Sequence, residues 1–163
     1  MRHLQFRSLD DLGTISELIH DQPLRWSLIR ALSDAKLVSI PYLATVHEES
    51  ERSRWYIVRR GIVSCVEASL IVLNAISFAV ESAIDLDDEG LTGGLLLDEL
   101  TWDATGSRVK IIAFPKVSMS VQVTGFAVDI KITDDVVATQ RRVGVFGGLL
   151  DVTSSPIPLI TRR

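Results

Sequence analysis

The chain has 163 residues, of which 47% are hydrophobic and 23% are charged, and its formal net charge is −4. This length suits one domain with a substantial core, and the composition is that of a globular protein rather than a disordered one. A net negative charge gives no general attraction to nucleic acid or to acidic membranes. Because Cys65 is the one cysteine, an internal disulfide and a cysteine-based zinc site are both excluded.

The first 60 residues predict a helical part. Residues 8–20 have the pattern of a short helix that Ser8 caps, and residues 21–36 have the pattern of a stronger second helix. The second helix would present one apolar stripe, formed by Leu24, Leu28, Ile29 and Leu32.

A basic cluster closes this part of the chain, next to two aromatic residues, Trp55 and Tyr56. Such a cluster can bind an acidic protein or the phosphates of a nucleic acid, although neighbouring glutamates neutralise part of its charge. Its members are Arg52, Arg54, Arg59 and Arg60.

Residues 21–37, with the sequence DQPLRWSLIRALSDAKL, resemble the first helix of winged-helix transcription factors. The resemblance implies that residues 40–46 form a second helix and that residues 51–60 form a recognition helix. Two features depart from that pattern: no clear turn separates these segments, and acidic residues occur where the backbone would meet DNA. A DNA-binding regulator that uses residues 21–60 is therefore an alternative function, and it requires a surface dominated by basic residues.

Residues 66–82 are almost wholly apolar. Only 13 uncharged residues separate Glu67 from Glu81, whereas a transmembrane helix needs about 20 apolar residues, so we expect no membrane span. The apolar residues fall on one face both at the helical and at the strand period. Length favours a buried helix and β-branched content favours a strand, so both interpretations stay open, with the helix preferred.

An acidic loop follows the apolar stretch. Residues 61–163 carry 8 basic and 13 acidic side chains, a balance of −5, and the acidic residues are concentrated in this loop. Carboxylates that repel one another either stay solvated or meet cations, so the loop predicts a surface for a basic partner. The residues concerned are Asp85, Asp87, Asp88 and Glu89.

The following segment, residues 93–155, predicts an antiparallel sheet. Residues 95–102 and 108–114 flank a turn signal and predict a hairpin, and residues 117–123 alternate apolar and polar side chains. The apolar face shifts by one residue at Gly125, which predicts a turn or bulge with a positive φ angle there.

Together these patterns predict a single α+β domain over residues 1–163, with N-terminal helices packed on a C-terminal antiparallel sheet of about four or five strands. The expected parts are a helical part with the basic cluster (1–60), the apolar stretch with the acidic loop (61–92), the β part (93–155) and a tail (156–163). Short matches between residues 57–105 and 107–155 raise a duplicated unit as a further interpretation, which would favour strands over residues 66–82.

Motifs for catalysis are weak in this sequence. The three histidines, His3, His20 and His47, lack the spacing of a metal site, and Cys65 reads as a buried, inert thiol. Asp98 and Glu99 are adjacent on an expected strand and would point to opposite faces. The one facing the core could line a cavity together with Asp129, which supports a small enzyme or ligand carrier as another alternative.

By elimination, we expect a non-catalytic cytoplasmic protein-interaction module, such as an inhibitor, an immunity-type protein or an assembly adaptor. Its partner would be another protein, basic in character, and no cofactor is expected. The N-terminus has no apolar segment of a secretory signal, which favours the cytoplasm. A homo-oligomer is compatible with the sequence.

Overall fold

The structure, a computed structural model, describes the backbone of residues 1–52, 58–82, 94–145 and 150–152. Side chains are described for residues 1–45, 64–82 and 94–137. Within these residues the chain forms one 11-stranded sheet, in which every pairing is antiparallel, and one short α-helix. The predicted fold of N-terminal helices on a sheet of four or five strands is therefore wrong.

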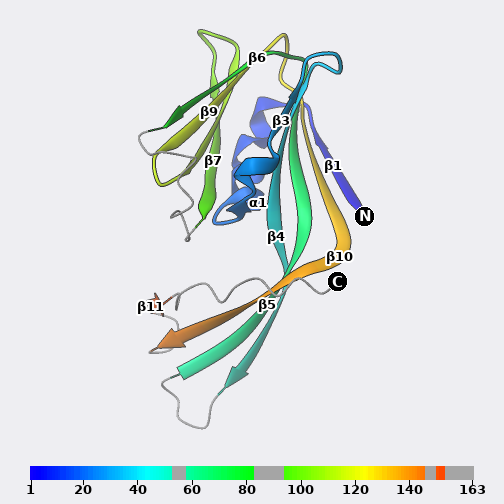
Figure 1. Ribbon diagram of the computed structural model, residues 1–163. Coiled ribbons are helices and arrows are strands. Elements are labelled where there is room, and N and C mark those ends of the chain that lie inside the picture. Colours follow the sequence, from blue (N-terminus) through cyan, green and yellow to red (C-terminus); the bar gives the residue numbers. More distant parts are fainter. Residues whose placement is uncertain (53–57, 83–93, 146–149, 153–163) are drawn as a thin grey trace.

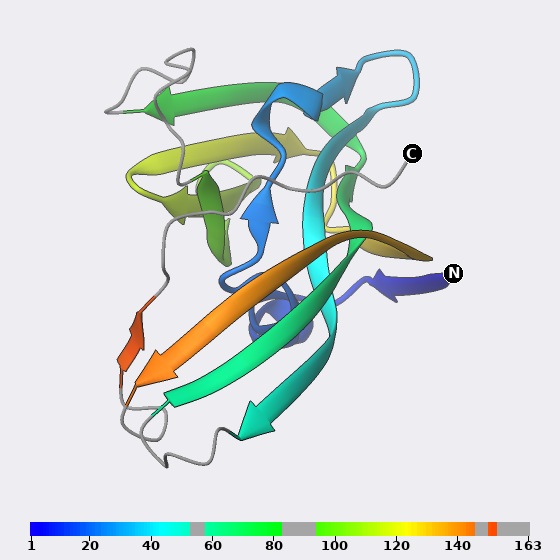
Figure 2. The ribbon, with the colours of Figure 1, turned by 60° about the horizontal axis from the view of Figure 1, so that its bottom comes forward.

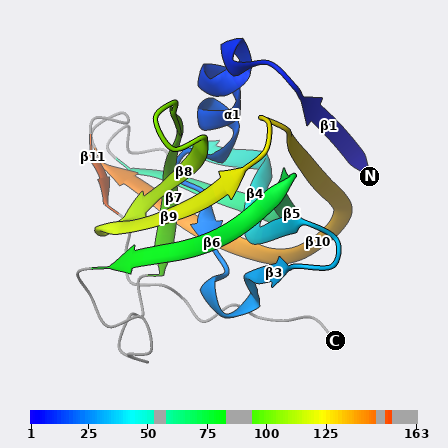
Figure 3. The ribbon, with the colours of Figure 1, turned by 90° about the horizontal axis from the view of Figure 1, so that it is seen from above.

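The sheet folds over into two layers (Figures 1 and 3), which are joined through β2, because β2 pairs with β4 in one layer and with β7 in the other. The strand order is β1-β10-β5-β4-β2-β7-β8-β9-β6, with β3 paired to β4 and β11 paired to β10. The strands are β1 (Arg2–Phe6), β2 (Pro23–Leu24), β3 (Arg30–Leu32), β4 (Leu37–Arg52), β5 (Val58–Leu73), β6 (Ala75–Ser82), β7 (Leu95–Asp103), β8 (Arg108–Phe114), β9 (Val117–Val123), β10 (Val128–Val145) and β11 (Leu150–Val152).

The core lies between the two layers and is built by alternating apolar residues, as expected for strands with one buried face. In β9 the predicted face is confirmed: Val117, Met119, Val121 and Val123 are all buried. The predicted hairpin is also confirmed, since β7 and β8 pair across the turn at residues 104–107. The opposite layer contributes Val38, Ile40, Tyr42, Val66, Leu70, Val72, Val128 and Ile130.

The apolar stretch at residues 66–82 forms two strands rather than a helix. Val66, Ala68, Leu70 and Val72 face the core from β5, which pairs with β4 on one side and β10 on the other. Asn74 takes a φ angle of 58° and turns the chain from β5 into β6. Asparagine tolerates this left-handed conformation better than most residues, so Asn74, rather than Gly125, supplies the positive φ at this corner. Gly125 itself does not have a positive φ angle.

One of the two predicted helices is confirmed. Ser8 caps a short 3-10 turn (η1, Leu9–Asp11) by accepting a hydrogen bond from the Asp10 backbone, and α1 (Leu12–Ile19) follows. Ile15 and Ile19 on α1 are fully buried in the core. The serine hydroxyl of Ser16 both donates to the carbonyl of Leu100 and accepts from its N–H, which fixes α1 on β7.

The second predicted helix, over residues 21–36, is wrong. These residues form β2, a 3-10 turn (η2, Trp26–Leu28) and β3. Of the predicted apolar stripe only Leu24 is buried, while Leu28 and Leu32 are 38% and 49% exposed. Leu24 pairs with Tyr42 and with Leu95, so this segment bridges the two layers.

Three strands continue well beyond the core and form a feature that we call the arm. The arm consists of residues 46–52 of β4, 58–63 of β5 and 138–145 of β10, together with β11. Backbone pairing runs along it without interruption. Between β4 and β5 it reaches Arg52 opposite Arg59, and between β10 and β5 it reaches Val145 opposite Val58. Figures 1 and 2 show the arm extending away from the two layers as a single twisted sheet.

Across the described residues, no helix is long and apolar enough to cross a membrane, as the sequence predicts.

Candidate functional site

Most residues of the two sites predicted from the sequence lie outside the residues whose side chains the structure describes. Asp85, Asp87, Asp88 and Glu89 fall within residues 83–93, outside the described residues, so the acidic surface stays a prediction. The basic cluster falls on the arm, where Arg54 is outside the described residues. The backbone register places Arg52 opposite Arg59 and Glu51 opposite Arg60.

The recognition helix that the winged-helix resemblance implied is absent, because β4 and β5 occupy the described part of residues 37–60. Segment 40–46, the implied second helix, likewise lies within β4. Arg52, Arg59 and Arg60 therefore lie on strands of the arm, and the described residues of this segment form no helix for DNA binding.

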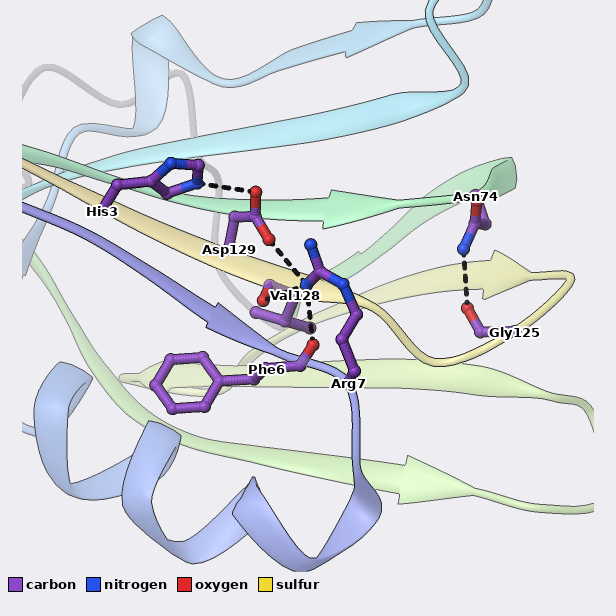
Figure 4. A network of polar contacts seen from close by, with 7 residues as sticks. All are labelled: His3, Phe6, Arg7, Asn74, Gly125, Val128 and Asp129. Atoms are coloured by element: carbon purple, nitrogen blue, oxygen red, sulfur yellow. Dashed lines mark hydrogen bonds and ion pairs between the residues drawn. The ribbon is translucent and has the colours of Figure 1, made fainter.

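A buried carboxylate, Asp129, is the centre of the best-defined polar cluster (Figure 4). Its side chain is 9% exposed, and it lies on β10 between two core residues that face the other way, Val128 and Ile130. The Nε2 atom of His3 lies 2.8 Å from Oδ2 of Asp129, and the Nη1 atom of Arg7 lies 2.7 Å from Oδ1. His3 lies on β1 and Arg7 directly follows that strand, which pairs with β10.

The arginine of this cluster also ties down the backbone. Nη1 of Arg7 donates to the carbonyl oxygens of Phe6 and Val128, at 2.9 and 3.1 Å. Its contact with Oδ1 of Asp129 is therefore an ion pair without hydrogen-bond geometry. Burial opposes ionisation of Asp129, but the hydrogen bond from His3 and the charge of Arg7 outweigh it, so the pKa of Asp129 lies below its ordinary value.

This cluster has the composition of an acid–base pair, yet its geometry indicates a structural role. The Asp129 carboxylate is occupied by His3 and Arg7, and together they attach the edge strand β1 to the sheet. Sequence analysis missed the cluster because its members lie more than 120 residues apart. The local sequence signal of this cluster is Asp129, a single acidic residue inside an apolar strand.

A second, exposed cluster joins α1 to β7. Nδ1 of His20 lies 3.1 Å from both the carbonyl oxygen and Oδ1 of Asp98, and Nε2 lies 3.5 Å from Oδ2 of Asp21. The hydrogen bond to the Asp98 carbonyl and the charge of Asp21 raise the pKa of His20. The side chain of His20 is 57% exposed, so the cluster is open to solvent rather than set in a pocket.

The expectation that Asp98 and Glu99 point to opposite faces is wrong. A β-bulge falls between Leu97 and Glu99 in the pairing with β8, and it places Asp98 as the extra residue. Leu97 and Leu100 face the core, so both acidic residues are kept out of it. Neither shares a cavity with Asp129, which lies in the other layer and is covered by β1.

A hollow of about 360 Å³ lies where β6, β8 and β9 meet. Its lining is formed by Glu81, Ser82, Ile112, Lys116, Val117 and Ser118. None of the acidic residues that sequence analysis placed in a cavity lines it. The ligand-carrier alternative therefore gains no support from this hollow.

Two buried residues, Cys65 and Tyr42, carry groups that could react or form hydrogen bonds. Cys65 is buried, as predicted, and packs with Leu43 where the arm begins. Tyr42 is 1% exposed, its hydroxyl has no hydrogen-bond partner among the described residues, and burial raises its pKa to about 12. Such an unsatisfied hydroxyl is rare in a core, because burying it without a partner destabilises the fold.

In the described part of the chain, no group of three or more potential metal-binding side chains comes together. Comparisons with known protein families, curated proteins and solved structures found no match to this chain.

Proposed function

We propose that this chain is a non-catalytic protein-interaction module, and that its arm contacts an acidic surface on a partner protein. The observation that carries the proposal is the extension of β4, β5 and β10 beyond the core. These strands have 16, 16 and 18 residues, whereas strands in globular domains usually have about 5 or 6. Among the residues whose side chains are described, the core uses the first half of β4 and of β10 and the second half of β5.

A single sheet is stable when another layer covers at least one of its faces. In the described part of the chain no second layer lies on the arm (Figures 1 and 2). A partner protein that packs on the arm would supply that layer. The proposal thus explains why the chain maintains long strands that its own core does not use.

The charge of the sequence supports an acidic partner surface for the arm. The arm contains five arginines and four acidic residues, a balance of +1, so the rest of the chain carries −5. A basic partner that meets Asp85, Asp87, Asp88 and Glu89 remains part of the same proposal, as a second contact. A cytoplasmic location is the setting that we propose for both.

Site-specific photo-crosslinking in the full-length chain tests the proposal. A photoreactive residue is placed at Glu49 and, in a separate variant, at Ser50, because successive strand positions probe both faces of the arm. The control position is Thr101 on β7, a half-buried residue of the sheet remote from the arm. We expect both arm positions, but not Thr101, to capture the same protein in cells.

The captured protein is then titrated against the purified chain. Charge reversal of Arg59 and Arg60 to Glu should weaken binding at least about tenfold and should reduce its dependence on salt. Equal capture from Thr101 and the arm, or binding that is unaffected by the reversal, would contradict the proposal.

A further inference from the structure

No described strand pairs with the outer edge of β6 over residues 76–81. β6 is the last strand of the order and pairs only with β9 among the described strands. Beyond that pairing, the one backbone hydrogen bond from a β6 residue to another described element is from the N–H of Ala75 to the carbonyl of Lys36, at 2.8 Å. Figure 3 shows β6 at the margin of its layer, next to β9.

This edge has less of the protection that strand edges usually carry, since its one bulge lies at its start, between Ala75 and Ser77. Natural sheets guard their edges with charged residues, prolines, bulges or short strands, because unpaired N–H and C=O groups can pair with another chain. β1, at the other end of the order, has five residues and carries Arg2 and His3. β6 has eight residues and one charge, Glu81.

Apolar side chains are exposed along the same edge. A bulge between Ala75 and Ser77 turns Ile76 away from the core, and its side chain is 61% exposed. Leu32 on β3 is 49% exposed and lies opposite Leu37 on β4. Leu37 directly follows Lys36, whose carbonyl accepts the hydrogen bond from the N–H of Ala75. A group of exposed apolar residues at an unpaired edge is typical of an interaction surface.

We propose that β6 pairs with β6 of a second copy of this chain, antiparallel and across a twofold axis that passes beside Ala79. Two identical strands satisfy each other in this arrangement, because a twofold axis makes the interface self-complementary. The two layers that contain β6 then join into one continuous sheet. This inference goes beyond the proposed function, since it does not involve the arm.

The side-chain pattern of β6 specifies this register. Ser77, Ala79 and Glu81 are exposed, while Phe78 and Val80 pack against the core. With Ala79 at the axis, Phe78 lies opposite Val80 of the partner subunit, an aromatic and β-branched pair that stabilises antiparallel strands. The small side chain of Ala79 leaves room for Ala79 of the partner subunit.

Charge also fits a second copy in this register. Ser77, whose hydroxyl donates to Oε1 of Gln122 at 3.3 Å within the subunit, lies opposite Glu81 of the partner subunit, so that a small neutral side chain faces each carboxylate. The two Glu81 residues are four positions apart along the paired strands, or about 13 Å, which avoids placing like charges opposite each other. Glu81 has no ion-pair partner among the described residues that would compete.

Disulfide trapping in the full-length chain tests this register. Opposed residues of antiparallel strands have Cα atoms about 4.5–5.5 Å apart, within the range of a disulfide, so Ala79→Cys should give a covalent dimer on mild oxidation. The matched control is Ser120→Cys, since Ser120 lies opposite Ala79 on β9. The two Ser120 residues of the dimer would lie about 14 Å apart, too far for a disulfide. The parent chain controls for the buried Cys65.

A charge substitution supplies the independent measurement. Analytical ultracentrifugation of the parent should show a concentration-dependent dimer, and Ala79→Lys should raise its dissociation constant at least about tenfold, because two ammonium groups would face each other. Ser120→Lys should leave the dissociation constant unchanged. A parent that stays monomeric at millimolar concentration, equal trapping at positions 79 and 120, or a dimer unaffected by Ala79→Lys would each overturn the inference.

Discussion

The Nε2 atom of His3 lies 2.8 Å from Oδ2 of Asp129, so that a carboxylate in a central part of the fold holds an edge strand in place. Arg7 completes the contact at 2.7 Å. A half-buried ion pair gains from its partners but leaves a costly unpaired charge when one of them is removed. The attachment of β1 should therefore depend on this one acidic residue.

We expect Asp129→Asn to lower the free energy of unfolding by about 1–3 kcal/mol, because the amide cannot form ion pairs with His3 and Arg7. Denaturant unfolding at pH 7 measures the change. The control is Asp134→Asn, which removes an exposed ion pair with the N-terminus and should change stability by less than about 0.5 kcal/mol. Equal effects of the two substitutions would contradict the role given to Asp129.

The same residue predicts part of the acid sensitivity. Because the pKa of Asp129 is lowered in the folded state, its stabilising contribution is present above the ordinary value of 3.8 and is lost as the pH falls through the lowered pKa. The stability difference between the parent and Asp129→Asn should therefore shrink below about pH 4. Unfolding measured at pH 7 and pH 3 checks this, and a difference that stays constant would exclude Asp129 as a source of acid sensitivity.

Local patterns in the sequence were sufficient for some elements. The hairpin of β7 and β8 and the buried face of β9 follow from alternation and from a turn signal between neighbouring segments. Helical spacing predicts α1, and Ser8 caps the 3-10 turn η1 that precedes it. Each of these elements is specified by residues close together in the chain.

Contacts between distant residues determine the elements that local sequence patterns left undecided or predicted wrongly. Residues 66–82 fit both periods. Pairing of β5 with β4 and β10, and of β6 with β9, selects strands. The apolar stripe of residues 21–36 fits a helix, but Leu24 joins Tyr42 and Leu95 and breaks it. The His3 and Asp129 contact needs the complete strand order, which no local pattern contains.

Asn74 should tolerate glycine but not valine. Its φ angle of 58° suits Asn and Gly, and its side chain adds only a long hydrogen bond, 3.4 Å, to the carbonyl of Gly125. We expect Asn74→Val to lower the free energy of unfolding by about 1–3 kcal/mol, and Asn74→Gly to lower it by less than about 1 kcal/mol. Denaturation midpoints compare the two variants.

The control for this corner is Gly125→Ala. No atom lies within 4 Å of the added Cβ and the φ angle is not positive, so stability should be unchanged. If Gly125→Ala proved as harmful as Asn74→Val, the backbone at the corner would not be as described.

Tyr42→Phe should leave the fold equally stable or raise its free energy of unfolding by up to about 2 kcal/mol, because the lost hydroxyl has no hydrogen-bond partner. Ile40→Val, a neighbouring core truncation, should instead lower it by about 1 kcal/mol. The pKa of Tyr42 is raised to about 12, so the parent should lose stability as the pH rises above about 10, and Tyr42→Phe should lose less. A clear loss of stability in Tyr42→Phe at pH 7 would show that the hydroxyl has a partner.

The acidic loop should accelerate binding if it meets a basic partner. We expect replacement of Asp87, Asp88 and Glu89 by Asn, Asn and Gln to slow association at low salt, since the loop would no longer steer a positively charged surface. Stopped-flow or surface-based kinetics with the captured partner, at low and high salt, measure the rate. The matched control replaces Asp10 and Asp11, exposed or half-buried acids beside α1, by Asn and should leave the salt dependence unchanged. A triple variant that associates as fast as the parent, with the same salt dependence, would remove the loop from the interface.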